Sequence, residues 1–203
     1  GPGAGPVLLF AGRIRPLRAA DLAVQALAEL HDPDAVLLIV GGPSGPDGDA
    51  ELAWLHELVA KLGVTDRVRF VPPQSHSDLA RYYRAVDVCL VPSHSESFGL
   101  VALEAAACGT PVVAAAVGGL VSLVDEGVTG VLVDRRDTVD FADPIARLPA
   151  NPASAPATGT APANPSPPAT RGMTSGRPRR RYNSRPTRQP GGGHARGTPT
   201  TPP

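Results

Sequence analysis

Residues 93–111 read Ser-His-Ser-Glu-Ser-Phe-Gly-Leu-Val-Ala-Leu-Glu-Ala-Ala-Ala-Cys-Gly-Thr-Pro. They follow the apolar run 88–91, Val-Cys-Leu-Val, whose length and β-branched residues predict a buried strand. The polar residues after this run predict a turn. The small residues that come next predict a helix that ends at Gly109, with Pro111 just beyond it. A strand, a polar turn and a helix in this order are typical of a ligand site at the carboxyl edge of a parallel sheet.

Apolar runs and helical periods alternate on both sides of this stretch. Strands are expected at residues 7–10, 36–40, 68–71, 88–91, 111–115 and 130–133. Further helices are expected at residues 21–30, 50–62, 78–83 and 138–148. The run 36–40 shows no alternation of apolar and polar side chains, as is typical of a strand covered on both faces. Strands that alternate with helices in this way predict an α/β fold with a doubly wound, Rossmann-like parallel sheet.

The 203 residues divide into two parts by charge and composition. All 19 acidic residues and 11 of the 19 basic ones precede residue 151, which gives this part a formal charge of −8. Residues 151–203 hold eight arginines, 12 of the 24 prolines, no acidic residue and no Leu, Ile, Val or Phe. Such a segment cannot bury enough apolar surface to offset the entropy lost on ordering. We therefore expect a linker or truncated edge at 1–6, one folded domain at 7–148 and a disordered tail at 149–203.

The basic tail leaves two interpretations open. An extended, arginine-rich arm is typical of nucleic-acid binding, whereas a tail without function is the expectation for a misread gene end, and we favour the second.

Cys89 and Cys108 predict a buried, reduced pair rather than a disulfide framework. No apolar run reaches the length of a membrane span, and residues 1–6 lack the basic-then-apolar pattern of a signal peptide. The sequence thus predicts a cytoplasmic protein.

Glu96 and Glu104 are the two acidic residues of the quoted stretch. On a helix, residues seven or eight positions apart share one face, so both carboxylates could address one elongated ligand. Carboxylates accept hydrogen bonds from sugar hydroxyls, and a helix N-terminus attracts phosphate. A nucleotide sugar offers both kinds of group. Two solvated glutamates on an amphipathic helix are the alternative.

Four stretches, in order along the chain, resemble one family of enzymes. They are 11–18 (Ala-Gly-Arg-Ile-Arg-Pro-Leu-Arg), 40–45 (Val-Gly-Gly-Pro-Ser-Gly), 69–74 (Arg-Phe-Val-Pro-Pro-Gln) and 95–104 (Ser-Glu-Ser-Phe-Gly-Leu-Val-Ala-Leu-Glu). The last matches the E-x7-E motif of retaining glycosyltransferases with two Rossmann-like domains, the GT-B architecture. Together the four look like the D-inositol-3-phosphate glycosyltransferases of mycothiol biosynthesis. The resemblance runs from about Val7 to Leu148 and covers the C-terminal, donor-binding half of such an enzyme.

The resemblance implies an activity for the whole enzyme. It would transfer N-acetylglucosamine from UDP-N-acetylglucosamine to 1D-myo-inositol 3-phosphate with retention of configuration. The acceptor site would lie in an N-terminal domain that has no counterpart here, so we expect the chain alone to bind UDP weakly and to transfer nothing. A homodimer is also implied, because family members are commonly dimeric. The alternatives are a transferase of the same family with another sugar or acceptor, and a truncated, non-catalytic nucleotide-sugar binding module.

The resemblance implies five donor-binding residues and no certain catalytic group. Arg13 and Arg18 would stabilise the leaving diphosphate; relatives carry Lys at the position of Arg18, and the two residue types are not interchangeable. Glu96 would accept hydrogen bonds from the donor sugar, and Glu104 from the ribose hydroxyls. Gln74 belongs to the stretch that frames the uracil. A solvated basic loop is the alternative for the arginines, and an ordinary turn for Gln74.

A structural magnesium ion is also implied by the resemblance. Mostly main-chain oxygens would hold it, at Tyr83, Arg84, Val86 and Thr110. Hard cations accept carbonyl ligands, although the sequence has no acidic cluster that would predict a metal site by itself. The chemistry of the transfer would not require a cofactor.

Several further polar or glycine residues are interpreted as ordinary surface, loop or turn residues. Arg15 is interpreted as a surface residue. His76 and His94 are interpreted as exposed loop histidines, since the sequence shows no partner that would make either an acid–base group. Gly118 and Gly119 could bring the backbone close to the donor, and a simple turn explains them equally well.

Overall fold

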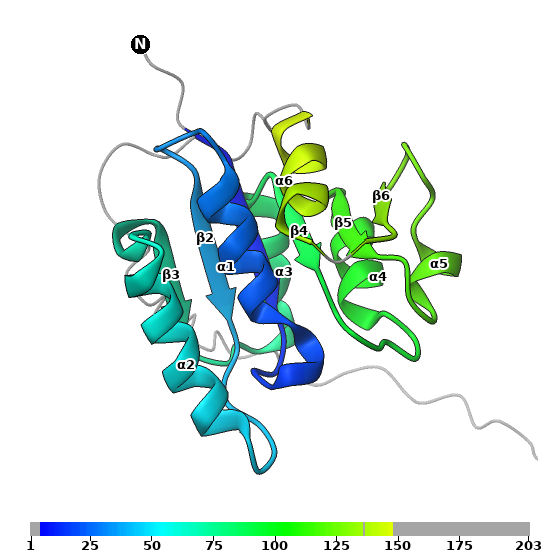
Figure 1. Ribbon diagram of the computed structural model, residues 1–203. Helices are drawn as coiled ribbons and strands as arrows, with labels where there is room; N and C mark the ends of the chain where they lie inside the picture. Colours follow the sequence, from blue (N-terminus) through cyan, green and yellow to red (C-terminus); the bar gives the residue numbers. More distant parts are fainter. Residues whose placement is uncertain (1–4, 136, 148–203) are drawn as a thin grey trace, which may run out of the picture. The chain divides into compact units, whose positions relative to one another are not determined.

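The computed structural model of the chain describes residues 5–135 and 137–147. The expected tail, Leu148 and the first four residues of the expected linker lie outside the described residues. Within the described part, six parallel strands form one sheet in the order β3-β2-β1-β4-β5-β6 (Figure 1). The strands are β1 Val7–Ala11, β2 Val36–Val40, β3 Val68–Val71, β4 Val88–Val91, β5 Val112–Ala115 and β6 Gly130–Val133.

Helices cover both faces of this sheet (Figure 1). One face carries α1 Ala20–Glu29, α2 Gly48–Lys61 and α6 Thr138–Arg147. The other face carries α3 His76–Ala85, α4 Leu100–Ala107 and the short α5 Leu120–Leu123. Two 3-10 turns, Pro16–Arg18 and Thr65–Arg67, precede α1 and β3. The predicted doubly wound α/β fold is confirmed.

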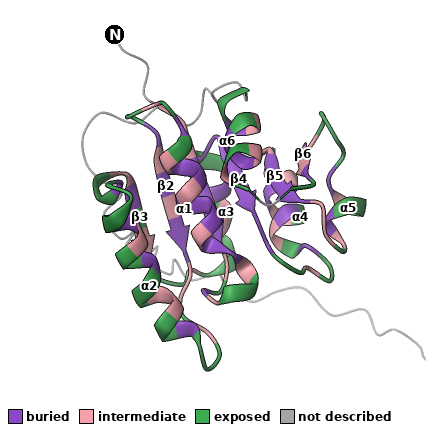
Figure 2. Ribbon diagram, in the orientation of Figure 1, coloured by how far each residue is buried: buried purple, intermediate pink, exposed green. Residues whose placement is uncertain are grey.

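Alternate side chains of each strand enter two separate cores, as the two-residue period of a strand requires. In β1, Leu8 and Phe10 join the core beneath α1, whereas Leu9 joins the core beneath α3 and α4. Each fully buried leucine contributes about 1.5–3 kcal/mol relative to an exposed one. β4 and β5 are buried at every residue (Figure 2), which explains why their sequences show no polar alternation.

At the carboxyl ends of β1 and β4, the chain leaves two neighbouring strands in opposite directions. β1 pairs with β2 on one side and with β4 on the other. The chain leaves β1 toward α1 on one face and leaves β4 toward α4 on the opposite face. A crevice opens where neighbouring parallel strands send the chain to opposite faces, and ligands of doubly wound sheets bind there.

The helix after β4 begins later than expected. α4 starts at Leu100, after Gly99 with a φ of 86°, so Glu96 lies in the loop before the helix. The expectation that Glu96 and Glu104 share one helix face is therefore wrong, because a left-handed glycine redirects the backbone between them. The other predicted helices agree with the structure to within two residues at each end. The sequence did not predict α5, because a four-residue helix is too short to show a helical period of apolar residues.

Candidate functional site

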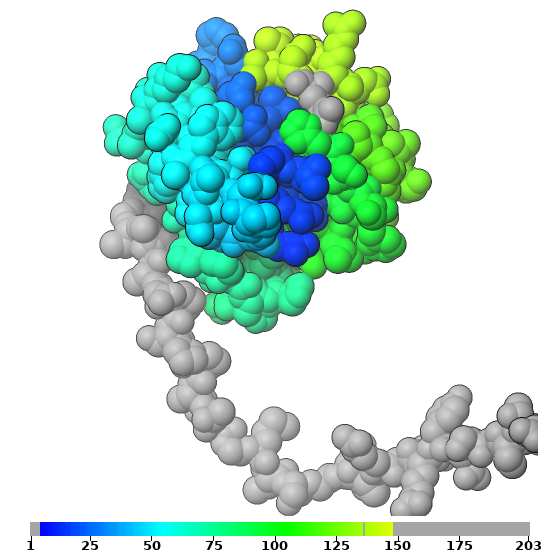
Figure 3. Space-filling model, turned by 60° about the horizontal axis from the view of Figure 1, so that its bottom comes forward, coloured from blue at the N-terminus to red at the C-terminus, as the bar shows by residue number. Residues whose placement is uncertain are grey.

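The loops that follow β1 and β4 meet at the carboxyl edge of the sheet. The main-chain N–H of His94 donates to the carbonyl of Leu17 over 3.0 Å, and Nη1 of Arg18 donates to Oε2 of Glu96. Figure 3 shows this side of the molecule, where the dark blue residues after β1 lie between the cyan and green parts of the chain. Two segments distant in sequence thus form one continuous surface at the predicted ligand edge.

The ion pair between Arg18 and Glu96 is largely shielded from water. The side chains are 21% and 11% exposed. Burial lowers the pKa of Arg18, and the charges of Arg15 and Arg13 lower it further. A guanidinium remains charged in spite of such shifts, so Arg18 lies close to two further cations and pairs with one carboxylate. The excess positive charge suits a ligand with several negative charges, such as a diphosphate.

Arg15 is more deeply placed than its interpretation as a surface residue implied. Its side chain is partly buried, and its Nε is buried without a hydrogen-bond partner among the residues that the structure describes. A buried N–H left unpaired costs about 1–3 kcal/mol. The spacing of Arg13, Arg15 and Arg18 within six positions was the available sequence signal that this loop concentrates charge.

Gly118 and Gly119 fix the backbone that carries Glu96. Gly118 has a φ of 50°, and a Cβ built on it would lie 2.0 Å from the carbonyl oxygen of Glu96. The N–H of Gly119 donates to the same oxygen over 2.9 Å. Because only glycine permits so close an approach, this pair positions the Glu96 loop in addition to making a turn. The contact joins residues more than 20 positions apart, which sequence spacing does not predict.

Glu104 lies on α4 and contacts two residues of α3. Its Oε2 accepts a hydrogen bond from the Tyr83 hydroxyl over 3.1 Å, and its Oε1 lies 3.6 Å from Nδ1 of His76. Burial raises the pKa of Tyr83, with further contributions from Cys89 and Glu104. The hydroxyl therefore stays protonated and can donate. His76 is exposed as expected, and the structure gives it a partner that the sequence did not show.

Gln74 lies in the loop between β3 and α3. Its Nε2 donates to the carbonyl of Pro72 over 2.8 Å, a local contact of the kind that ordinary turns make. Gln74 also stands two residues before His76, the first residue of α3 and a neighbour of Glu104. Gln74 therefore lies near the N-terminal end of α3, where His76 neighbours Glu104. Its role in binding stays a prediction.

The residues expected to hold magnesium meet where α3 ends. The hydroxyl of Thr110 donates to the main-chain carbonyl of Tyr83 over 2.5 Å, so these two positions are brought together. Carbonyls at a helix C-terminus carry partial negative charge, which suits a hard cation. Over residues 5–135 and 137–147, no group of three or more His, Cys, Asp or Glu side chains is placed to hold a metal ion. Magnesium at this position stays a prediction.

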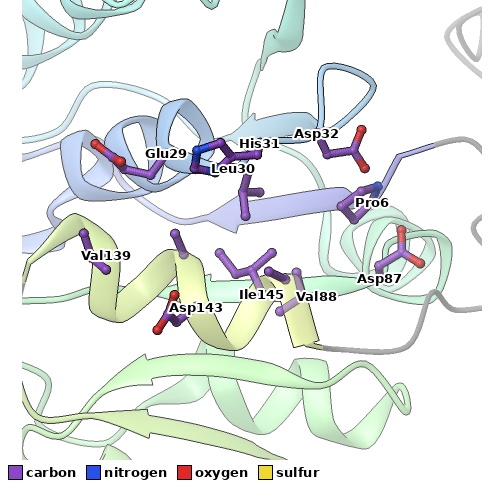
Figure 4. A pocket seen from close by; sticks show the side chains of 12 residues that line it. Pro6, Glu29, Leu30, His31, Asp32, Asp87, Val88, Val139, Asp143 and Ile145 are labelled. Atoms are coloured by element: carbon purple, nitrogen blue, oxygen red, sulfur yellow. The ribbon is translucent and has the colours of Figure 1, made fainter.

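A hollow of about 550 Å³ lies at the opposite edge of the sheet (Figure 4). Pro6, just before β1, and Asp87 and Val88, at the start of β4, line it together with residues of α1 and α6. Oδ2 of Asp87 accepts a hydrogen bond from the main-chain N–H of Val7 over 2.7 Å, which ties the start of β1 to the start of β4. Because strands begin at this edge, the hollow is separate from the loops that carry the candidate site.

Two further expectations concern the chain as a whole. Cys89 is buried and Cys108 is partly buried, and neither forms a disulfide within the described residues, so Cys108 is less buried than expected; the reduced state stays a prediction. Among the residues that the structure describes, none of the helices has the length and apolar character needed to span a bilayer.

Known proteins are similar to this chain in sequence and in fold. A family model described as glycosyl transferases group 1 matches residues 2–161. The D-inositol 3-phosphate glycosyltransferase of Saccharomonospora viridis is 54% identical over 153 residues, which make up 72% of this chain and 35% of that protein. The chain thus spans about a third of the length of the curated relatives it matches.

Solved structures match over a similar portion of the chain. Anabaena Alr3699/HepE in complex with UDP superposes with a TM-score of 0.66 and 30% identity, over 70% of this chain and 38% of that one. The C-terminal domain of LpcC, a group 1 glycosyl transferase family protein of Francisella tularensis, superposes with a TM-score of 0.63 and 27% identity, over 72% of this chain and 76% of that one.

Proposed function

The chain belongs to the group 1 glycosyltransferases and has the fold of the C-terminal domain of their GT-B enzymes, and from this premise we propose that it is the donor-binding part of a retaining transferase. The whole enzyme transfers N-acetylglucosamine from UDP-N-acetylglucosamine to 1D-myo-inositol 3-phosphate, the first step of mycothiol biosynthesis. The names of the relatives support this choice of acceptor.

The contact between Arg18 and Glu96 is the observation that carries this proposal. In a nucleotide sugar, the sugar is bonded directly to the β-phosphate. A cation that binds the phosphate and a carboxylate that accepts from the sugar hydroxyls must therefore be neighbours. Arg18 and Glu96 are such neighbours, at the edge where the chain leaves β1 and β4 toward opposite faces of the sheet, and Arg13 adds a second cation close to Arg18.

The other candidate residues follow in the order of the donor's remaining groups. Glu104, proposed for the ribose, lies one helical turn into α4, about 6 Å along the helix from Leu100. It adjoins His76, and Gln74, proposed for the uracil, precedes His76 by two residues. We propose that these residues meet the sugar, diphosphate, ribose and uracil of one donor molecule; the proximity of His76 to Glu104 supports this for the ribose and uracil positions.

We propose a front-face transfer assisted by the leaving diphosphate. The bond between the anomeric carbon and the β-phosphate oxygen breaks, a bond from the acceptor hydroxyl oxygen forms on the same face, and the hydroxyl proton passes to the departing phosphate oxygen. Arg13 and Arg18 stabilise the charge that grows on that oxygen. The acceptor must be held against the donor for this step, so the chain alone binds the donor and transfers nothing.

Calorimetric titration of the 203-residue chain with UDP and UDP-N-acetylglucosamine tests the proposal. We expect both to bind and Glu104→Ala to weaken UDP binding by at least about tenfold, since hydrogen bonds to a charged group are lost. Glu57→Ala is the matched control, because Glu57 is an exposed glutamate on α2. Absence of UDP binding by the unsubstituted chain contradicts the proposal.

The same titration separates the alternatives within the family. Tighter binding of UDP-glucose than of UDP-N-acetylglucosamine would favour a transferase with another sugar. Equal binding of UDP and of every UDP-sugar would favour a non-catalytic nucleotide module. Release of UDP from UDP-N-acetylglucosamine in the presence of 1D-myo-inositol 3-phosphate would contradict the proposed inactivity of the chain alone.

Two further features belong to this proposal. A magnesium ion at the main-chain oxygens of Tyr83, Arg84, Val86 and Thr110 would be structural, so magnesium should raise the melting temperature and leave UDP affinity unchanged. A homodimer is the second feature, and sedimentation equilibrium of the chain would detect it.

A further inference from the structure

Tyr83 is held rigidly next to the proposed ribose ligand. Its side chain is 1% exposed and lies in the core shared by α3 and α4. The Thr110 hydroxyl donates to its main-chain carbonyl, so both the backbone and the ring are fixed. From this position its hydroxyl donates to Oε2 of Glu104 over 3.1 Å.

Glu104 has little else to orient it. Its side chain is 34% exposed, and a glutamate on a helix surface has several rotamers to lose when a ligand orders it. His76, its other neighbour, is 94% exposed and 3.6 Å away, and ion pairs so exposed to solvent restrain side chains weakly. Among these contacts, the buried hydroxyl of Tyr83 is the one that can select a single orientation of the carboxylate.

We infer that Tyr83 is a positioning residue for nucleotide binding: its hydroxyl orients the Glu104 carboxylate so that both oxygens can accept from the two vicinal hydroxyls of a ribose. The inference rests on the proposed function, in which Glu104 is the ribose ligand. An ionised carboxylate has about four acceptor positions, so one hydrogen bond from Tyr83 leaves room for both ribose hydroxyls. Orientation before binding reduces the entropy lost on binding.

The substitution Tyr83→Phe removes the hydroxyl and keeps the ring in the core. Tyr82→Phe is the matched control, because Tyr82 is the neighbouring tyrosine on α3, is partly buried against the same core, and makes no hydrogen bond through its hydroxyl with the residues described by the structure. Each variant of the full chain is titrated with UDP and with 2′,3′-dideoxyuridine diphosphate, which lacks both ribose hydroxyls.

We expect Tyr83→Phe to weaken UDP binding about tenfold and to leave binding of the dideoxy nucleotide within about twofold. The preference for UDP over the dideoxy nucleotide then falls, as it does in Glu104→Gln. Tyr82→Phe should keep the preference of the unsubstituted chain. An equal loss for both nucleotides would indicate general destabilisation and overturn the inference, as would a preference unchanged by Tyr83→Phe.

A second measurement tests the contact between Tyr83 and Glu104 itself, and the titrations separate failure of this inference from failure of the proposed function. Chemical unfolding of Tyr83→Phe, Glu104→Gln and the double variant gives the coupling between the two side chains without any ligand. If the unsubstituted chain does not bind UDP, both the proposed function and the positioning role are overturned, whatever the coupling. If it binds UDP and Glu104→Gln loses the preference but Tyr83→Phe does not, only the positioning role is overturned.

Discussion

The guanidinium of Arg18, in the turn after β1, is hydrogen-bonded to the carboxylate of Glu96, in the loop after β4. The two residues are 78 positions apart in the chain. Their strands are neighbours in the sheet, so the loops that follow them lie side by side at its carboxyl edge. Because both side chains are mostly shielded from water, removal of one leaves the other charge unpaired and only partly hydrated.

Arg18→Ala should therefore destabilise the fold and weaken donor binding together. We expect the free energy of unfolding to fall by about 2 kcal/mol, because Glu96 is left as a partly buried, unpaired charge. We expect UDP affinity to fall by at least about tenfold. Chemical denaturation and calorimetry measure the two effects.

Arg81→Ala is the control for this variant. Arg81 is an exposed arginine, and its ion pair with Asp78 lies on the surface of α3, where such pairs contribute about 0–1 kcal/mol. If Arg18→Ala behaves like Arg81→Ala in both measurements, the pair with Glu96 has no energetic role.

Arg15→Met should stabilise the chain in the absence of ligand. Methionine keeps a long unbranched side chain, removes the buried Nε that has no partner among the described residues, and removes a like charge near Arg18. Arg13→Met removes a like charge as well, but Arg13 is exposed. We expect Arg15→Met to raise the free energy of unfolding by about 1 kcal/mol more than Arg13→Met does. A loss of stability specific to Arg15→Met would show that its guanidinium is well solvated or paired.

Gly118→Ala should disturb the Glu96 loop specifically. Its new Cβ would lie 2.0 Å from the carbonyl oxygen of Glu96, so the loop must move, and we expect a loss of about 2–4 kcal/mol and of UDP binding. Gly127→Ala is the matched control, since Gly127 has a φ of 75° but nothing within 4 Å of the new Cβ. That variant should lose about 1 kcal/mol, the strain of the backbone alone, and keep UDP binding. Equal losses in the two variants would exclude a specific role for the contact with Glu96.

Tyr83 should ionise only when the protein unfolds. Burial, followed by the neighbouring Cys89 and Glu104, raises its pKa above the ordinary value of about 10. Above about pH 10 the unfolded chain then binds fewer protons than the folded chain, so the free energy of unfolding falls as the pH rises, by up to about 1.4 kcal/mol per pH unit. Below that pH the group makes no difference. Chemical denaturation across this range should show a shallower decline in Tyr83→Phe than in Tyr82→Phe, and parallel declines would contradict the shift.

Local patterns made most of the fold predictable. Residues 36–40 and 88–91 had to be strands covered on both faces, because apolar runs of this length without polar alternation fit a parallel sheet between two layers of helices. These two runs became β2 and β4. Two features escaped because they depend on few residues: the four-residue α5, and the left-handed Gly99 that removes Glu96 from α4.

The candidate site was predictable only as a set of residue types. Arg13, Arg18, Glu96 and Glu104 could be proposed from spacing and resemblance, since they stand at the ends of predicted strands or on the helix that follows. The partners of these residues could not be proposed in this way. The contacts of Glu104 with Tyr83 and of the Glu96 carbonyl with Gly119 join segments whose proximity no local period encodes.

Residue order alone was enough to establish alternating strands and helices, the division of charge along the chain and the chemical character of the two loops. Tertiary packing was needed to establish that Arg18 faces Glu96 and that Tyr83 supports Glu104. The physical reason is that two side chains can touch only when their backbones lie within several ångströms of each other. The strand order of the sheet makes β1 and β4 neighbours and so brings their loops this close. Strand order in turn follows from burying both faces of the sheet at once, which is a property of the whole domain and of no single segment.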